Sequence, residues 1–181
     1  MDNVTSYKHR FFSTPILKVL DFLLQNPDDE FSDSDIGSAG LGIKKSSINS
    51  ALRFLSSIGW VKRKKVGKTA VNRLCQGEAI IGYLKIASNL LTIGPFVEEC
   101  KRYSYKMILF GSRADGSNVS DSDFDILAVT HNADMVRKIW SGADLSLQLI
   151  VKTPEEMIGL DEREPVLSMS ITKGIVLWEK I

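Results

Sequence analysis

The chain has 181 residues, of which 44% are hydrophobic and 25% are charged, and its formal net charge is +1. This length and composition suit one large globular domain or two small ones, and they argue against a disordered or low-complexity protein. We see no leader-like segment and no apolar run of the roughly 18 residues that a membrane helix needs, so we expect a cytoplasmic protein with no membrane partner. The isolated Cys75, Cys100, His9 and His131 lack the spacing of zinc ligands.

The charges are unevenly distributed along the chain. Residues 1–78 carry a net charge of +4 and residues 79–181 a net charge of −3. Residues 44–73 contain nine basic side chains and no acidic one. This asymmetry predicts two domains with different partners.

The first half predicts three helices followed by a hairpin. In chain order, we expect a helix around residues 16–23 that ends at Asn26-Pro27, a short helix beginning at residues 31–36 with Ser and Asp caps, a helix opening at residues 45–47, and strands at residues 60–66 and 69–74 around Gly67-Lys68. In the third helix, Ile48, Ala51, Leu52 and Leu55 share one face at helical spacing. The opposite face is polar and the hairpin is basic.

This order of elements is similar to the winged helix-turn-helix domains of prokaryotic transcription regulators. The resemblance implies that residues 1–77 bind double-stranded DNA through a recognition helix and a wing. The expected DNA contacts are Lys45, Ser47, Asn49 and Arg53 on the helix and Lys62, Arg63, Lys64, Lys65 and Lys68 on the wing. The wing should mainly contact phosphates, which makes binding sensitive to salt. Small three-helix domains also bind proteins, and this alternative stays open.

A linking segment follows at residues 78–103. An apolar stripe predicts a helix from Glu78 to about Thr92, which we expect Gly94-Pro95 to break before a further helical turn at residues 96–102. The stripe can serve as internal core or as the contact surface of a homodimer, and the pattern favours neither.

The second half contains two motifs that carry chemistry. The apolar strand Met107–Phe110 runs into the Gly111-Ser112 turn, which can hold a phosphate through backbone N–H groups and a hydroxyl. A second strand carries Asp123 and Asp125 on one face, because alternate strand residues point the same way. Adjacent carboxylates are suitable ligands for Mg²⁺ or Mn²⁺. A Walker-type loop is excluded, since Ser117-Asn118 stands where Lys-Ser/Thr is required.

Together, Gly-Ser-Arg-Ala-Asp-Gly at 111–116 and Ser-Asp-Phe-Asp-Ile at 122–126 resemble the signature of the minimal nucleotidyltransferases of the polymerase β superfamily, and the resemblance covers about residues 94–181. It implies an α+β chain, in which a winged helix-turn-helix precedes a small mixed-sheet α/β nucleotidyltransferase domain at residues 104–181. It further implies that Gly111 and Ser112 bind the triphosphate of an NTP, with added charge from Arg113. Asp123 and Asp125 would be both metal ligands and catalytic residues.

In that family an NMP group moves to an acceptor hydroxyl and pyrophosphate leaves. Some minimal members are antitoxins that modify a toxin, which implies a toxin-like protein partner, while others modify small molecules. Neither habit includes a fused winged helix, so the acceptor is not readable from this sequence.

The sequence departs from the family pattern at two positions. The strand at residues 145–151 carries Gln148 where relatives have a third carboxylate, and Asp144 lies about 13 Å away along a strand. Asp115 stands where Arg is common. Two functions therefore stay open: a nucleotidyltransferase that binds DNA, and a non-catalytic transcription regulator whose second domain senses a nucleotide or dimerises. Beyond this strand, a Thr153–Glu156 capping box and a final strand at residues 174–178 complete the predicted elements.

Overall fold

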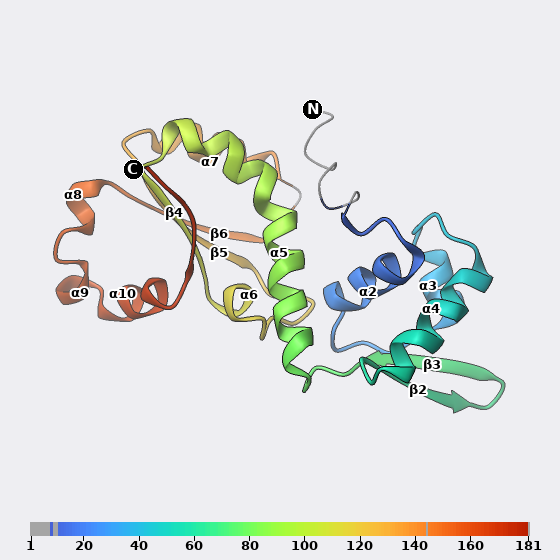
Figure 1. Cartoon of the computed structure of the whole chain (residues 1–181). Helices are drawn as coiled ribbons and strands as arrows, with labels where there is room; N and C mark the ends of the chain where they lie inside the picture. The colour runs from blue at the N-terminus through green and yellow to red at the C-terminus, as the bar shows by residue number, and fades with distance from the viewer. Residues whose placement is uncertain (1–7, 9–10, 144, 181) are drawn as a thin grey trace. The chain divides into compact units, whose positions relative to one another are not determined.

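The structure is a computed structural model that describes residue 8 and residues 11–143 and 145–180. The described part of the chain divides into two compact units, with the boundary between Ser88 and Asn89. The division falls inside one long helix, α5 (Ala79–Cys100). Figure 1 shows the elements of each unit.

In its described part, the first unit packs helices against a small antiparallel sheet of strand order β1-β3-β2. Its elements before α5 are α2 (Pro15–Gln25), β1 (Phe31–Ser32), α3 (Asp33–Ser38), α4 (Lys45–Ser57), β2 (Val61–Val66) and β3 (Thr69–Leu74). Thr14 caps α2, and Ser32 with Asp35 forms a capping box on α3. The four apolar residues expected to share a face of α4 are all buried in the core of this unit.

Helix α5 continues through Gly94-Pro95, so the expected break is wrong. A proline inside a helix removes one hydrogen bond and costs about 3 kcal/mol. Here Ile93 and Val97, on either side of the proline, are both buried in the core of the second unit. We attribute the continuous helix to this burial, which offsets the lost bond.

Helix α5 is more apolar than we expected, since the sequence analysis found no run long enough for a membrane helix. The segment Ala79–Tyr103 is long and apolar enough to cross a membrane, by length and composition alone. Its middle carries Lys85, Ser88 and Asn89, all three buried, and both Ser88 and Asn89 form hydrogen bonds to other elements of their own units. Each of these two hydrogen bonds holds the helix to other elements of the unit in which it lies.

The second unit is built on a mixed four-stranded sheet of order β6-β5-β4-β7. After α5, the described elements are η1 (Lys101–Tyr103), β4 (Lys106–Phe110), α6 (Ser112–Asp115), β5 (Phe124–Val129), α7 (Ala133–Ser141), β6 (Leu147–Lys152), α8 (Pro154–Met157), α9 (Leu160–Arg163), α10 (Pro165–Thr172) and β7 (Ile175–Glu179). Strand β4 pairs antiparallel with β5 and β7, while β5 pairs parallel with β6. The predicted Thr153–Glu156 capping box is present on α8.

The two faces of this sheet have different coverings. Alternate residues such as Leu109 and Ile126 pack with α5 and α7 in one cluster. The residues between them, such as Ile108 and Leu127, pack with α9 and α10 in another. Figure 1 shows α8, α9 and α10 as one run of short helices beside the sheet. Successive side chains of a strand point to opposite faces of the sheet, so every second residue lies on the face covered by α9 and α10. The polar residues of the candidate site lie on this face.

Candidate functional sites

A row of three residues crosses the sheet at the end of β4. Phe110 is paired with Asp125 across the antiparallel ladder, and Asp125 is paired with Gln148 across the parallel one. Registered neighbours project from the same face of a sheet. Phe110 belongs to the cluster packed with α9 and α10, so Asp125 and Gln148 lie on that face as well. Gln148 is exposed and Asp125 is half-buried.

Gly111 lies directly against Asp125. Its φ of 70° is in the left-handed region that favours glycine. A Cβ at this position would come within 2.2 Å of the Asp125 Oδ2 atom. The turn after β4 therefore brings bare backbone to a carboxylate, and any side chain here would displace that carboxylate. Ser112 follows at the start of α6 and is half-buried.

The two aspartates behave as a close pair of like charges. Burial raises the pKa of Asp125 above its ordinary value, and the neighbouring Asp123 charge raises that pKa further. Asp123 is exposed just before β5, and one of its oxygens accepts a hydrogen bond from the Ser146 hydroxyl. A divalent cation would relieve this repulsion, and Mg²⁺ is commonly held by one or two carboxylates together with substrate phosphates. The donor set fits such an ion, although the described residues contain no group of three or more His, Cys, Asp or Glu that could hold one.

Arg113 does not point toward the turn as a free cation. Its side chain is buried, and its Nε and Nη2 donate to the Ser122 carbonyl at 2.9 and 2.6 Å. Its Nη1 donates to the Asn89 side chain, and its guanidinium lies 4.1 Å from the centre of the Phe124 ring. Burial lowers the pKa of Arg113, and the nearby Asp123 charge opposes that shift. The expected contact with the triphosphate is thus not the role that this side chain has here, since its donors hold the loop that carries Asp123.

Asn89 is the part of this arrangement that sequence reasoning missed. It is 1% exposed, donates to the Arg113 carbonyl at 3.0 Å and to the Asn118 side chain at 3.1 Å, and accepts from the Arg113 guanidinium. A polar residue within the apolar stripe of α5 was the available signal. Asn118 itself is 2% exposed. Helix α5 therefore anchors the loop between the Gly-Ser turn and the aspartates.

The two departures from the family pattern have different outcomes. Asp115 turns into its own loop, where its carboxylate accepts the Ser117 N–H at 2.9 Å, and it is exposed. Gln148 lies beside Asp125 in the parallel register of β5 and β6. Asp144 lies outside the described residues. A cavity of about 430 Å³ adjoins the row, lined by Phe110, Gln148 and the beginning of α10.

The basic residues of the first unit fall into two groups. Most of those expected to contact DNA are exposed: Lys45, Arg53, Lys62, Lys64, Lys65 and Lys68. Ser47 is half-buried, and Lys64 forms an exposed ion pair with Glu30 at 2.8 Å. Arg73 is exposed opposite Lys62 in the hairpin register, and it is a further candidate that our expectation omitted, although it lies in the acid-free stretch.

Arg63 and Asn49 are held inside the unit instead. Arg63 makes a two-pronged contact with Asp33, 2.9 Å at each oxygen, and its Nη1 also donates to Asn72. Asn49 donates to Asp33 at 2.8 Å, as does the fully buried Asn72 at 3.0 Å. Burial tends to raise the pKa of Asp33, but the hydrogen bonds from Arg63, Asn72 and Asn49 hold it below its ordinary value. The expectation that Arg63 and Asn49 contact DNA does not fit these contacts, because the network occupies both side chains.

The comparison with known proteins found one family match, and it lies in the second unit. Residues 95–169 match the family of nucleotidyltransferase domains. No curated protein matches the chain. A solved structure from Sulfolobus solfataricus, provisionally assigned as a nucleotidyltransferase, is 22% identical, with a TM-score of 0.36 over 56% of this chain and 87% of that one. The domain match supports nucleotidyl transfer in general.

Proposed function

We propose that the second unit is a metal-dependent nucleotidyltransferase, which transfers an NMP group from an NTP to a hydroxyl acceptor. The observation that carries the proposal is the approach of Gly111 to Asp125. Phosphates bound along a bare turn would lie directly beside a carboxylate whose pKa is raised by burial and further raised by the Asp123 charge.

Each residue has a distinct part in this proposal. Gly111 and Ser112 bind the β and γ phosphates through backbone N–H groups and the hydroxyl. Asp123 and Asp125 would hold Mg²⁺ or Mn²⁺, which when bound neutralises phosphate charge and lowers the pKa of an attacking hydroxyl. Arg113 is a positioning residue, because it fixes the loop before Asp123. The cavity beside Gln148 is the natural place for an acceptor, since it is adjacent to the row and mostly apolar.

The test is calorimetric titration of each of the four NTPs with Mg²⁺ into the wild-type chain and Asp125→Asn. This experiment needs no knowledge of the acceptor. Micromolar to sub-millimolar binding that the variant loses supports the proposal. If no NTP binds, or if Asp125→Asn binds as tightly as the wild type, the carboxylate pair is not a nucleotide site.

We further propose that the first unit is a winged helix-turn-helix that binds double-stranded DNA. Support comes from the order of its elements, helix, short strand, helix, helix and hairpin, and from the exposed cations of β2 and β3. Lys62, Lys65, Lys68 and Arg73 would contact phosphates, while Lys45 and Arg53 extend the same positive surface along α4. Homodimerisation, a toxin-like partner and a cytoplasmic location remain proposals of the sequence alone.

One observation favours a second function, that of a regulator without catalysis. The position beside Asp125 is occupied by the neutral Gln148, and an amide adds no charge and cannot act as a general base. In this alternative the second unit senses a nucleotide or dimerises. A Gln148→Asp variant tests whether Mg²⁺-dependent binding of NTP needs a third carboxylate. If wild-type binding of NTP already requires Mg²⁺, the third carboxylate is dispensable for binding; if only the variant acquires that requirement, the result favours the regulator.

A further inference from the structure

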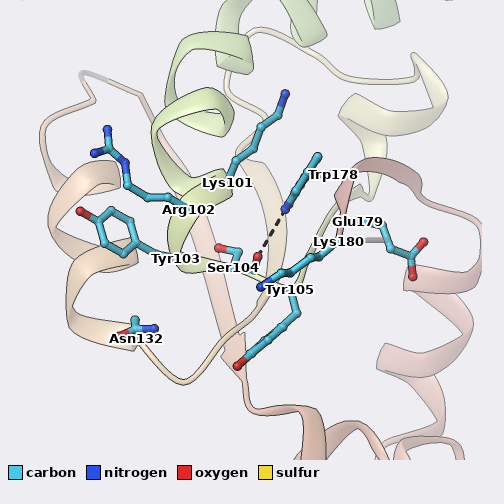
Figure 2. A pocket seen from close by; sticks show the side chains of 9 residues that line it. All are labelled: Lys101, Arg102, Tyr103, Ser104, Tyr105, Asn132, Trp178, Glu179 and Lys180. Carbon is cyan, nitrogen blue, oxygen red and sulfur yellow. Dashed lines mark hydrogen bonds between the residues drawn. The ribbon is translucent and has the colours of Figure 1, made fainter.

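The other end of the same sheet carries a cavity that the proposed function does not use. Its volume is about 440 Å³, and it is lined by η1, by the residues leading into β4, and by the end of β7 (Figure 2). The Phe110 row lies at the opposite end of β4, four residues from Lys106. A strand rises about 3.3 Å per residue, so roughly 13 Å of sheet separates the two places.

The walls of this cavity combine aromatic rings with cations. Figure 2 shows Tyr103, Trp178 and Tyr105 on different sides of Ser104. Each ring has its own basic partner: Lys101 lies 5.2 Å from the centre of Trp178, Arg102 lies 5.5 Å from Tyr103, and Lys180 lies 5.7 Å from Tyr105. Cation–π pairs occur roughly once per 70–80 residues in protein structures, so three around one cavity are a local concentration of such pairs.

The positive charge of the cavity is only partly compensated. Lys101 is paired with Glu98, and Glu179 is paired with Lys106. Within the part of the chain that the structure describes, Arg102 and Lys180 form no ion pair, and both are exposed. The cavity can therefore accept an anion without breaking an existing salt bridge.

The floor of the cavity also retains an unused polar group. Ser104 is 4% exposed, and its hydroxyl finds no hydrogen-bond partner among the described residues. Its carbonyl, in contrast, accepts from the Trp178 indole at 3.3 Å. Buried hydroxyls are normally paired, so the Ser104 hydroxyl is available to form a hydrogen bond with a bound ligand atom or a water.

We propose that this cavity binds a nucleotide, either a free mononucleotide or the terminal nucleotide of a single-stranded nucleic acid. A nucleotide offers the flat π-face of its base to the rings and its phosphate to Arg102 and Lys180, which is the combination that single-strand binding proteins recognise. The volume lies within the range of small-ligand sites. The proposal stands apart from the nucleotidyltransferase assignment, because it uses none of the residues of the Phe110 row.

The experiment measures binding of a fluorescein-labelled, 5′-phosphorylated hexa-adenylate RNA to the full chain by anisotropy. EDTA is present throughout, which excludes metal-dependent binding at the aspartates. The background carries Lys62→Ser, Lys65→Ser and Lys68→Ser, so the wing contributes little. Two cavity variants, Lys180→Glu and Tyr105→Ala, are made separately in this background. The matched control is Arg137→Glu, a charge reversal at an exposed position of α7 that does not line the cavity.

Each cavity variant should bind the RNA roughly tenfold more weakly, while Arg137→Glu binds as the background does. Competition by AMP indicates a mononucleotide site, and binding of RNA that AMP cannot displace indicates a strand end; either result supports the proposal. Three results would overturn the proposal. The first is absence of RNA binding, and the second is an equal loss of affinity in Arg137→Glu. The third is displacement of the labelled RNA by inorganic phosphate or a phosphotyrosine peptide as effectively as by unlabelled RNA. Lys180→Glu keeps the test valid if Tyr105→Ala misfolds, because Lys180 is a surface side chain.

Discussion

At the scale of single residues, Gly111 combines two constraints that are usually separate. Its backbone is left-handed, and the space that a side chain would occupy is already filled by the Asp125 carboxylate. Gly159 shares the first constraint, with a φ of 69°, but it faces open space. A substitution of Gly159 therefore tests backbone strain alone, while a substitution of Gly111 tests backbone strain together with displacement of the Asp125 carboxylate.

We predict that Gly111→Ala abolishes NTP binding, whereas Gly159→Ala does not. Both substitutions should destabilise the unit by about 1 kcal/mol through the left-handed backbone. Only Gly111→Ala should also push the Asp125 carboxylate away from the turn. Calorimetry with Mg²⁺ and denaturant unfolding check the two effects. Tight NTP binding by Gly111→Ala would show that the Asp125 position is unimportant.

Asp125→Asn should stabilise the metal-free unit at neutral pH. The folded pKa of Asp125 is raised, so its ionised form opposes folding above that pKa, and the penalty fades as the pH falls toward the unfolded value of about 4. The amide removes the charge and the repulsion from Asp123. In thermal unfolding with EDTA the variant should melt above the wild type, and added Mg²⁺ should raise only the wild type. A lower melting point for the variant in EDTA would contradict this account.

Sequence reasoning located the residues of the row but not their neighbours. The Gly-Ser and Asp-x-Asp motifs are local, and a strand alternation of two was enough to place Asp123 and Asp125 together. The role of Arg113 depends on Asn89, which is 24 residues away, and no local pattern encodes such a contact. For the same reason, a motif match alone suggested a phosphate ligand where the structure has a buried tether.

At the scale of elements, the Asp33 network joins α3, α4 and the β2–β3 hairpin. Asp33 accepts hydrogen bonds from Asn49 of α4 and from Arg63 and Asn72 of the hairpin. The hydrophobic periodicity of α4 and the alternation of the strands were readable from sequence. The sequence did not show which basic residue of the hairpin points inward. Residues 62–65 are all basic, so no alternation of polar and apolar residues distinguishes the two faces of the strand.

We expect the network to make the first unit sensitive to acid. A lowered folded pKa contributes stability above the unfolded value of about 3.9, and this contribution is lost as the pH falls through the folded pKa. The protection factors of the α3 and β2 amides, which are corrected for the intrinsic pH dependence of exchange, should therefore fall below about pH 4 in the wild type. In Asp33→Asn these protection factors should be lower at neutral pH and change less with acid. Equal pH profiles for the two proteins would remove Asp33 from this role.

The hairpin lysines should behave differently from Arg63. Replacing Lys62, Lys65 and Lys68 by Ser should leave unfolding nearly unchanged and reduce the salt slope of DNA binding by about one unit per lysine. Arg63→Met should instead destabilise the unit by about 2 kcal/mol, because it removes the cation paired with the Asp33 carboxylate, with little change in slope. Anisotropy at several salt concentrations and denaturant unfolding measure both. A slope that is the same in the triple variant and the wild type would exclude the hairpin from the DNA contact.

Two adjacent residues of α5, Ser88 and Asn89, make hydrogen bonds in different units, so their substitutions can be compared directly. Ser88 donates to Asp21 in the first unit, while Asn89 holds the loop at Arg113 and Asn118 in the second. Asn89→Ala should cost about 1–3 kcal/mol and weaken NTP binding, since buried partners lose their hydrogen bonds. Ser88→Ala should leave NTP affinity unchanged. Calorimetry of both variants decides whether Asn89 positions the site.

At the scale of the whole molecule, the uneven charge of the sequence corresponds to two units of different architecture. The boundary lies within α5 between Ser88 and Asn89, rather than in a flexible linker. Composition and motif order were sufficient to anticipate two units. The boundary itself was not predictable, because a continuous apolar stripe contains no signal of where its packing partner changes.

The register of β5 and β6 has a consequence in evolutionary terms. Gln148 lies beside Asp125, and every glutamine codon becomes a glutamate codon by a change of its first base. A mutation of one nucleotide would thus place a carboxylate beside Asp125, in addition to that of Asp123. The chain stands one mutational step from a site with three carboxylates, so the neutral residue is readily exchanged for an acidic one in a lineage that selects for it.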